Sequence, residues 1–571
     1  MFLPDWLKHY EKGQLNGDLI AGIIVAVVLV PQAMAYGLLA GLPPEVALYS
    51  SVLPLILYAA FGSSRTLAVG PVGLMSLMTG ATLIELGIND LPGMISAAHT
   101  LALLVGTILL LMRLARLGVV INFLSHPVIS GFISASAIII ALSQMKHIFG
   151  LNISLGLPAY ETLAQLLIQL PQSDLAASVI GISSLVLLWA FKAPLVSFLS
   201  KTSISEGVAQ LISKSGPLVA VAISTSIVYF LNLDTQHQVS IIGKIPPGLP
   251  EIILPSLDKA LILKLLPSAF LIALIGYLES VSIAKSMASQ KRQKIDSNKE
   301  LIGLGTANIA SAISGGYPVA GGFGRSMVNF TAGANSPLAS IISAGLVGLT
   351  LLVLTPLFFF LPKATLAAII VFAVLPLIDT HSFKRALAYD KADAFSLLGT
   401  FFTVLIIDVE SGIIAGVIMS VCLYLYRSSQ PHIAIVGQVG NSEHYRNIDR
   451  HNVKTDDKII AIRIDENLYF ANTNFLEDTI MQIVADNSAV NHIVLICSSV
   501  SVIDTSGLES LEDILFRLRK VGVKLHLAEV KGPVMDRLKG TEFLNNLSKN
   551  SIFLSTHQAM QALKSSQQPL S

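Results

Sequence analysis

The sequence predicts a mostly α-helical membrane protein of about 14 transmembrane segments, followed by a C-terminal cytoplasmic α/β domain. Hydrophobic residues fill 53% of the 571 positions and charged residues 13%, whereas an average soluble domain has about 25% charged residues. Long apolar runs continue as far as Arg427, and beyond it charged residues alternate with short strand-like and helix-like runs. The net charge of +1 gives no reason to expect a nucleic-acid partner.

The transmembrane part is divided by the lengths of its apolar runs and by the breaks between them. The expected segments are residues 18–40, 46–61, 71–87, 96–113, 127–145, 175–192, 214–231, 262–285, 300–315, 325–335, 338–360, 364–378, 393–408 and 411–427. Lys and Arg gather in the loops after the even-numbered segments, for example between Lys285 and Glu300. We therefore expect a multi-pass protein of the cell inner membrane, in contact with lipid, with both termini in the cytoplasm.

One stretch in the second half, Ser314 to Ala339, is too broken to cross a membrane as a continuous helix. It begins extended around Pro318, passes through three glycines, and becomes helical from Arg325 to about Ala332. Such a half-helix spans roughly 12–15 Å, about half of the hydrocarbon thickness. Irregular backbone at this depth lines a cavity or is buried in protein, and a helix N-terminus attracts anions. With Arg325 at that end, the stretch predicts an anion site.

A similar stretch lies in the first half, from Ser63 to Gly80. It has a short extended run, then Gly70 and Pro71, and proline suits the first turn of a helix. Interrupted segments at corresponding places in two halves indicate a transporter site between inverted repeats. The alternative is that both stretches are kinked core helices that tolerate glycine and proline.

Three polar side chains in apolar segments are candidates for the same site. Glu279 costs about 2.5–3.5 kcal/mol to place in a membrane, and such residues usually face a cavity or carry protons. Apolar surroundings favour the neutral carboxyl group, so Glu279 is the candidate for proton coupling, with a structural pair to arginine as the alternative. Gln32 and, one turn later, Tyr36 either contact the anion or bond within the protein. The expected substrate-binding residues are Gln32, Tyr36, Gly70, Pro71, Val72, Phe323, Gly324, Arg325 and Ser326.

The C-terminal region is expected to form an α/β domain over residues 433–563, with a disordered tail over 564–571. Asp504 to Gly507 follow a strand and open a helix, which is typical of a helix N-cap. Cys422 and Cys497 lie far apart, so no disulfide and no cysteine metal site is expected. The sequence has no P-loop or catalytic-triad motif, and we expect neither an enzyme nor a metal or other cofactor.

Four motifs follow one another along the chain: PQAMAYGLLAGLPPEVALYSS (31–51), FLSHPVISGF (123–132), IIGKIPPGLP (241–250) and NKELIGLGTANIASAISGGYPV (298–319). In this order they resemble the sulfate permease (SulP) family of anion transporters. The chain departs from the family pattern at Ala47, where glycine is usual, and at Gly324, where many members have a hydroxyl residue. The C-terminal region resembles the STAS domain.

The resemblance implies a transmembrane anion transporter domain over residues 1–428, built as 7+7 inverted repeats that are split between a core domain and a gate domain. It places the substrate between the third and tenth segments, which are the two half-helices. It also implies a homodimer, a cytoplasmic protein or nucleotide as a partner of the STAS domain, and Ser506 as a phosphorylation candidate.

Together these features predict a secondary active transporter for sulfate, bicarbonate or a dicarboxylate, working as a proton-coupled symporter by alternating access. Sodium coupling would need several oxygen ligands around Glu279. The open alternatives are a sodium-dependent bicarbonate symporter and an anion sensor that signals through the STAS domain.

Overall fold

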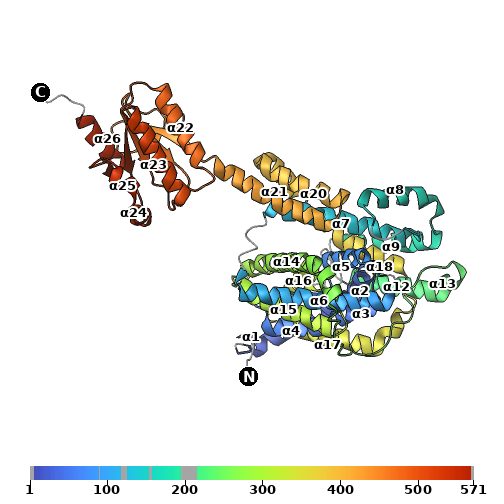
Figure 1. Ribbon diagram of the computed structural model, residues 1–571. Coiled ribbons are helices and arrows are strands. Elements are labelled where there is room, and N and C mark those ends of the chain that lie inside the picture. Colours follow the sequence, from blue (N-terminus) through green and yellow to red (C-terminus); the bar gives the residue numbers. More distant parts are fainter. Residues whose placement is uncertain are drawn as a thin grey trace. The chain divides into compact units, whose positions relative to one another are not determined.

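The computed structural model describes residues 5–8, 10–88, 90–117, 125–153, 157–192, 194–195 and 215–566. The chain divides into two compact units, Met1–Ser420 and Val421–Ser571. Figure 1 shows that the first unit is built from helices and that the second contains a sheet. The first residues of the motif at 123–132 and the last five residues of the expected tail lie outside the described ranges.

Every expected transmembrane segment coincides with helix in the described residues. The first seven correspond to α2 (Leu15–Leu39), α3 and α4 (Pro44–Tyr49 and Leu53–Phe61), α5 (Gly73–Glu85), α6 (Leu91–Leu114), α7 (His126–Phe149), α9 (Leu175–Lys192) and α12 (Gly216–Leu231). The others correspond to α14 (Lys259–Gln290), α15 (Ser297–Ile313), α16 (Phe323–Thr331), α17 (Leu338–Leu349), α18 (Lys363–Val374), α20 (Lys391–Ile406) and α21 (Val409–Ser429). Nine helical segments of the described chain are long and apolar enough to cross a membrane.

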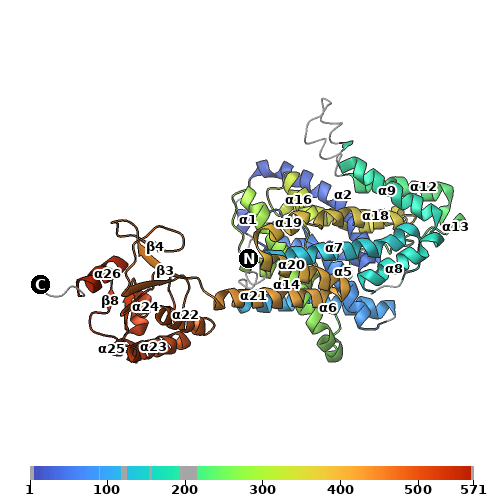
Figure 2. The same ribbon diagram turned by 90° about the horizontal axis from the view of Figure 1, so that it is seen from above.

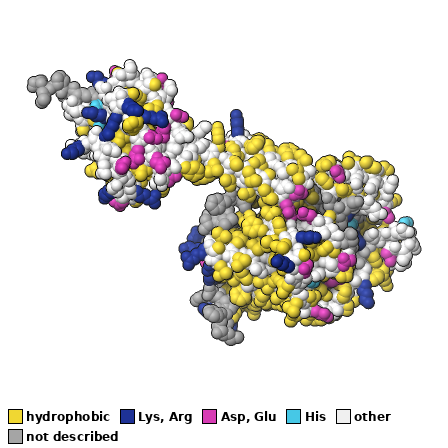
Figure 3. All heavy atoms as spheres, viewed as in Figure 1, with side chains coloured by type: hydrophobic (Ala, Val, Ile, Leu, Met, Phe, Trp, Pro, Cys, Tyr) yellow, Lys and Arg dark blue, Asp and Glu magenta, His cyan; other side chains and the backbone are white. Residues whose placement is uncertain are grey.

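In the described part of this unit, four further α-helices were not expected: α1 (Asp5–Lys8), α8 (Ala159–Gln169), α13 (Leu233–Gln236) and α19 (Thr380–Tyr389). The two longer ones are amphipathic, so a search for uniformly apolar runs passes over them. The surface of the helical unit is suited to contact with lipid, because hydrophobic side chains cover most of its visible face (Figure 3). Leu175 on α9 and Phe230 on α12 are among the most exposed hydrophobic side chains of this unit.

Two short strands show how the halves are related. Strand β1 (Val69–Gly70) precedes α5 and strand β2 (Ala320–Gly321) precedes α16. They pair antiparallel, with Val69 opposite Gly321 and Gly70 opposite Ala320. Because equivalent strands of two oppositely oriented repeats must meet antiparallel, this pairing marks the centre of the inverted repeats. It also satisfies backbone groups of the extended stretches that precede the half-helices inside the membrane.

The helices separate into a core domain and a gate domain. In the core, α15 packs against α4 and α6, α14 against α6, and α17 against α2. In the gate, α18 packs against α7 and α9, and α20 against α7; Figure 2 shows α7 and α18 running side by side. Between the two domains α2 contacts α12 and α18, and α5 contacts α7. The half-helices α5 and α16 therefore lie in the core, with α5 reaching the boundary to the gate.

The second unit contains a six-stranded sheet in the order β4-β3-β5-β6-β7-β8. The strands are β3 (Ile433–Gln438), β4 (Tyr445–Asn447), β5 (Ile459–Ile464), β6 (His492–Ile496), β7 (Lys524–Ala528) and β8 (Ile552–Phe553). Strand β3 pairs antiparallel with β4 and β5, and β5 to β8 run parallel. The helices are α22 (Thr473–Asp486), α23 (Thr505–Lys520), α24 (Gly532–Leu538), α25 (Glu542–Asn546) and α26 (Thr556–Ser565).

Helix α26 corrects the expected start of the tail. It includes Lys564 and Ser565, which the sequence placed in the disordered segment. Its Met560 and Leu563 are buried in a hydrophobic cluster with residues of β3, β5 and β6. Burial of these apolar side chains holds the helix on the sheet through its last turn. The apolar residues of α22 and α23 belong to a separate cluster.

Candidate anion site

The two half-helices begin without a side-chain cap. Their N-cap residues are Val72 for α5 and Gly322 for α16, and both have extended backbones. Neither residue has a side chain that can accept from the first-turn N–H groups. The partial positive charge of each helix end is therefore available to an anion. Gly322 is required here, because a Cβ atom at that position would lie 2.9 Å from Cγ1 of Val72.

A cavity of about 150 Å³ lies at these helix ends, with walls from α2, α5, α7, α14, α16 and the end of α18. Seven of the expected site residues line it: Gln32, Tyr36, Val72, Glu279, Phe323, Gly324 and Arg325. They come from four helices that are far apart in the sequence. Since a water molecule occupies about 30 Å³ in the liquid, the space can hold a small anion with some of its water.

Arg325 is the positive charge of this cavity, and its side chain is only 2% exposed. Its Nη1 donates to the carbonyl oxygen of Pro71, so the side chain reaches from α16 to the start of α5. The Nε and Nη2 groups have no hydrogen-bond partner among the described residues. Buried donors of a charged group are costly to leave unpaired. A bound anion would satisfy both of them.

Gly70, Pro71 and Ser326 do not line the cavity, and the structure gives them positions behind it. Gly70 belongs to β1, where its φ of 155° disfavours other residues and an added Cβ atom would lie 3.3 Å from Nη2 of Arg325. The Ser326 hydroxyl accepts from the N–H of Ala68 at 2.9 Å, which joins the two half-helices. These three residues hold Arg325 and the strand pair in place.

Glu279 brings a carboxyl group to the same cavity from α14. Its Oε2 atom has no hydrogen-bond partner among the described residues, and the side chain is close enough to Arg325 for the two charges to interact. On α2, Nε2 of Gln32 donates to the Tyr36 hydroxyl at 3.2 Å, and Oε1 of Gln32 is without a partner in the described chain. The cavity thus contains a cation, an acid and unpaired polar atoms together.

The sequence reasoning missed a polar frame around the extended backbone. Asn308 on α15 donates to the Val319 carbonyl and accepts from the Val319 N–H, both at 2.9 Å. Ser280, beside Glu279, accepts from the N–H of Gly321 at 2.8 Å. It also missed Ser136, which lines the cavity and whose hydroxyl has no partner among the described residues. The available signal was polar residues within apolar helices, although serine alone is common there.

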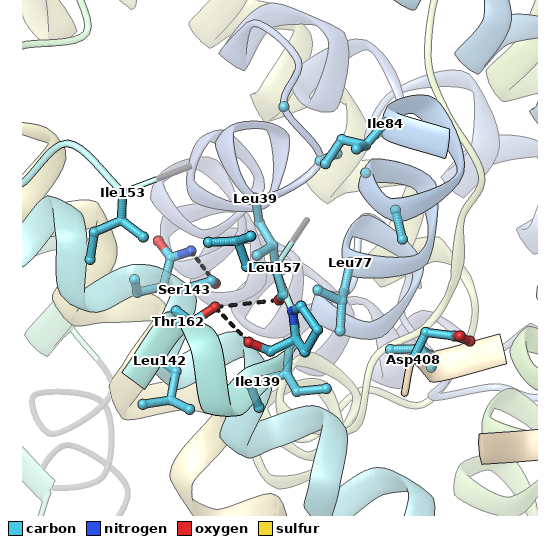
Figure 4. Close-up of a pocket in the computed structure, with 18 of the residues that line it drawn as sticks. Leu39, Leu77, Ile84, Ile139, Leu142, Ser143, Ile153, Leu157, Thr162 and Asp408 are labelled. Atoms are coloured by element: carbon cyan, nitrogen blue, oxygen red, sulfur yellow. Dashed lines mark hydrogen bonds between the residues drawn. The ribbon is translucent and has the colours of Figure 1, made fainter. Parts of the chain in front are cut away.

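A second cavity, of about 160 Å³, is shown in Figure 4. Its walls are mainly apolar and come from α2, α5, α7 and α8, with Leu39, Leu77 and Ile139 among the labelled residues. The hydroxyl group of the labelled Thr162 already donates to the carbonyls of Leu157 and Pro158, so its proton is not available to a bound anion. Apolar walls cannot replace the water around an anion. The cavity of Arg325 is therefore the candidate anion site.

In the second unit, Asp504 caps α23. Its Oδ1 accepts from the N–H of Gly507 at 2.8 Å and its Oδ2 from the N–H of Phe470 at 3.0 Å. Ser506 is the second residue of the helix and is half-buried. The capping function thus belongs to Asp504, and phosphorylation of Ser506 stays a prediction that mass spectrometry of the cellular protein would check.

We expect Asp504→Ala to loosen the first turn of α23 and Ser506→Ala to leave it unchanged. Losing the cap and its second hydrogen bond costs about 1–2 kcal/mol, which is a factor of roughly 5–30 in the local opening equilibrium. Hydrogen–deuterium exchange of the full-length protein should show this acceleration at the first turn of α23 for Asp504→Ala only. Equal acceleration in Ser506→Ala would contradict the assignment.

Comparison with known proteins gives the family. The sulfate permease family matches residues 15–400 and the STAS domain matches residues 450–559. Probable sulfate transporter 4.2 of Arabidopsis thaliana is 34% identical over 569 residues, covering 97% of this chain and 82% of the relative. A probable sulfate transporter of Mycobacterium tuberculosis is 31% identical over 564 residues, covering 98% of this chain and 97% of the relative.

Solved structures show the same fold. The murine solute carrier 26 family member A9 anion transporter superposes with a TM-score of 0.89 at 23% identity, covering 99% of this chain and 94% of its own. The transmembrane domain of the cyanobacterial bicarbonate transporter BicA gives a TM-score of 0.60 at 24% identity, covering 72% of this chain and 98% of its own. The protein is an anion transporter and not an enzyme, and the chain belongs to the sulfate permease family with a C-terminal STAS domain.

Proposed function

We propose that the protein is a proton-coupled symporter of a divalent oxyanion, with sulfate as its substrate and Glu279 as the proton carrier. The observation that supports this is the arrangement of Arg325 and Glu279. Both side chains line one cavity, and both have polar atoms without partners among the described residues. The N-termini of α5 and α16 add partial positive charge at the same place.

Counting charges favours the divalent anion. Each helix N-terminus contributes about half a positive charge, so Arg325 and the two helix ends together supply about two positive charges. With Glu279 ionised, one negative charge of a monovalent anion already balances the site. A divalent anion leaves an excess of about one negative charge, which protonation of Glu279 removes. Because uncompensated charge is expensive in a site shielded from water, binding of a divalent anion and of a proton should be linked.

A sodium-dependent bicarbonate symporter is the second candidate. Bicarbonate is monovalent, so the site would need no proton. Three cavity oxygens are without partners among the described residues, namely Oε1 of Gln32, the Ser136 hydroxyl and Oε2 of Glu279. Sodium prefers oxygen ligands of these kinds. The structural relative BicA is a bicarbonate transporter, which is in line with bicarbonate, whereas the Arabidopsis relative is a probable sulfate transporter.

Uptake into proteoliposomes separates these functions. Sulfate, bicarbonate, fumarate and chloride would each be offered with an inward proton gradient, with an inward sodium gradient, and with neither. We expect sulfate to accumulate under the proton gradient and the sodium gradient to have no effect. Sodium-driven bicarbonate accumulation would favour the second candidate, and absence of flux for every anion would favour an anion sensor.

We also propose that the transporter is a homodimer of the cell inner membrane with both termini in the cytoplasm. The distribution of Lys and Arg between the loops supports this orientation, and the family resemblance supports the dimer. The STAS domain then faces the cytoplasm, where a protein or a nucleotide can bind it. Crosslinking in membranes and protease accessibility in sealed vesicles would check the assembly and the orientation.

A further inference from the structure

A third cavity, of about 450 Å³, lies within the gate domain, away from Arg325. It is formed where α7 ends and where α9 and α18 begin, and its walls are mainly polar. The side chains that matter here are Lys146, His147, Asp174 and Lys363. No described residue that lines the anion site belongs to it.

Three basic side chains meet at this cavity. Lys146 and His147 occupy the last turn of α7, and Lys363 is the first residue of α18. Lys363 is near enough to both of the others for their charges to repel. Among the described residues neither lysine forms an ion pair with a carboxylate, and the one hydrogen bond of the Lys146 ammonium group goes to the carbonyl of Ile153 at 3.3 Å. The repulsion is therefore not offset within the described chain.

Helix stability explains why a lysine stands at position 146, but it does not explain the lysine at position 363. A lysine at the C-terminus of a helix is favourable, because it compensates the negative end of the macrodipole. Lys363 stands at the opposite, positive end of α18, where a cation is unfavourable. Its N–H is already used, since it donates to the Ser240 carbonyl at 2.9 Å. The charge of Lys363 thus adds to the positive end of the helix beside a second lysine.

The acidic side chain in the wall does not cancel this charge. Oδ1 of Asp174 accepts from the N–H of Ala177 at 2.8 Å, so its charge is directed to the first turn of α9. Two lysines against one aspartate leave one positive charge, even with His147 neutral. The N-terminus of α18 adds about half a charge more. The cavity is positive, polar and large enough for a hydrated oxyanion.

We propose that this cavity is a second anion site, separate from the transport site, which binds a small inorganic oxyanion such as sulfate through Lys146 and Lys363. The ion offsets the repulsion between the basic groups and is held by their free N–H donors. Lys146 and His147 also line the apolar cavity of Figure 4, which extends to α2 and α5. The positive charge of Lys146 and Lys363 attracts anions to this part of the protein, which increases the rate of capture at the transport site.

Chemical modification of lysine tests the site without requiring transport. The full-length protein in detergent is treated with an amine-reactive reagent at constant ionic strength, and the modification of each lysine is followed by mass spectrometry. Bound sulfate should slow modification of Lys146 and Lys363 by a factor of about 1 + [sulfate]/Kd, roughly tenfold at ten times Kd. Lys244 is the internal control, because it is exposed and does not line the cavity.

Variants of each site test the second anion site independently of the proposed transport function. In Arg325→Gln the protection of Lys146 and Lys363 should persist, because the second site does not use Arg325. The double variant Lys146→Gln/Lys363→Gln should raise the KM for sulfate uptake without changing kcat, and Lys244→Gln should change neither. Protection without any uptake would reject the transport function and keep this site. Sulfate that leaves Lys146 and Lys363 as reactive as before, or that slows Lys244 equally, would overturn the proposal.

Discussion

Arg325→Gln is expected to remove most sulfate uptake while leaving a folded protein in the membrane. Arg325 lines the cavity, and the substitution deletes its two unpaired, charged donors. Charge-assisted hydrogen bonds contribute about 1.5–3 kcal/mol each. A loss of about 3 kcal/mol corresponds to a factor of roughly 10² in uptake at low sulfate concentration. The pairing of β1 with β2 and the hydrogen bond from Ala68 to Ser326 do not involve the guanidinium group, so both half-helices should remain in place.

Two further variants give this prediction its controls. Arg65→Gln removes the same charge from an exposed position just before β1 and should transport normally. Arg325→Lys keeps the charge but loses the planar fork of donors, so its uptake should fall between the wild type and Arg325→Gln. If Arg325→Gln takes up sulfate at the wild-type rate at equal expression, Arg325 does not bind the substrate.

Glu279→Gln is expected to abolish acid-driven accumulation of sulfate while sulfate exchange continues. Glutamine imitates the protonated carboxyl group, so the site stays in the form that accepts a divalent anion. Binding of the anion and binding of the proton strengthen each other by the same factor in the wild type, and the variant has no proton to release. A proton gradient can then no longer drive net uptake. The measurement compares sulfate uptake into proteoliposomes under an inward proton gradient with sulfate exchange at equal pH.

The matched control for this variant is Glu251→Gln, which removes a carboxylate from an exposed residue outside the cavity. It should accumulate sulfate as the wild type does. Accumulation by Glu279→Gln that responds to the proton gradient as fully as the wild type would make Glu279 a structural residue. The coupling proton would then have to bind elsewhere.

The composition of the site could be predicted from the sequence because its residues break local rules. Pro71 and the glycines around Arg325 interrupt apolar runs, and such interruptions are tolerated at membrane depth only around a cavity or inside protein. Glu279 is an acid within an apolar helix, where insertion is costly. Each of these signals is local, and the structure brings Glu279 and Arg325 to one cavity.

The arrangement within the site could not be predicted, because it depends on contacts between the two repeats. Nothing in the sequence around Arg325 indicates that its side chain bonds to the Pro71 carbonyl of the other half-helix. For the same reason Ser326 was expected at the substrate but bonds to the backbone of Ala68. Asn308 was missed because its partner, the Val319 backbone, becomes unpaired only when the stretch is extended rather than helical.

The elements of the fold likewise divide into those with a clear local sequence pattern, which could be predicted, and those without one. Uniformly apolar runs locate the transmembrane helices well, whereas the amphipathic α8 and α19 escape such a search. In the second unit the parallel strands β5 to β7 were expected, because IIAIRID, NHIVLICSS and KLHLAEV are strand-like apolar runs beyond Arg427. Strands β4 and β8 were not, because a strand of two or three residues has no detectable period.

Occupancy of the cavity by sulfate is the most direct test of the account, and Gly324→Cys makes it measurable. An added Cβ atom at Gly324 meets no atom within 4 Å, so the thiol fits at the cavity wall. Cys422 is exposed and would be replaced by serine, whereas Cys497 is buried, and burial raises its pKa to about 12, so that it stays unreactive.

The rate at which a small thiol reagent modifies the introduced cysteine would be measured in the full-length Gly324→Cys protein at increasing sulfate concentrations. We expect sulfate to slow the modification with the same half-saturation as uptake, and the protection to disappear in a variant that also carries Arg325→Gln. An unchanged rate of modification at sulfate concentrations that saturate uptake would show that the anion binds elsewhere, and would contradict the assignment of the site.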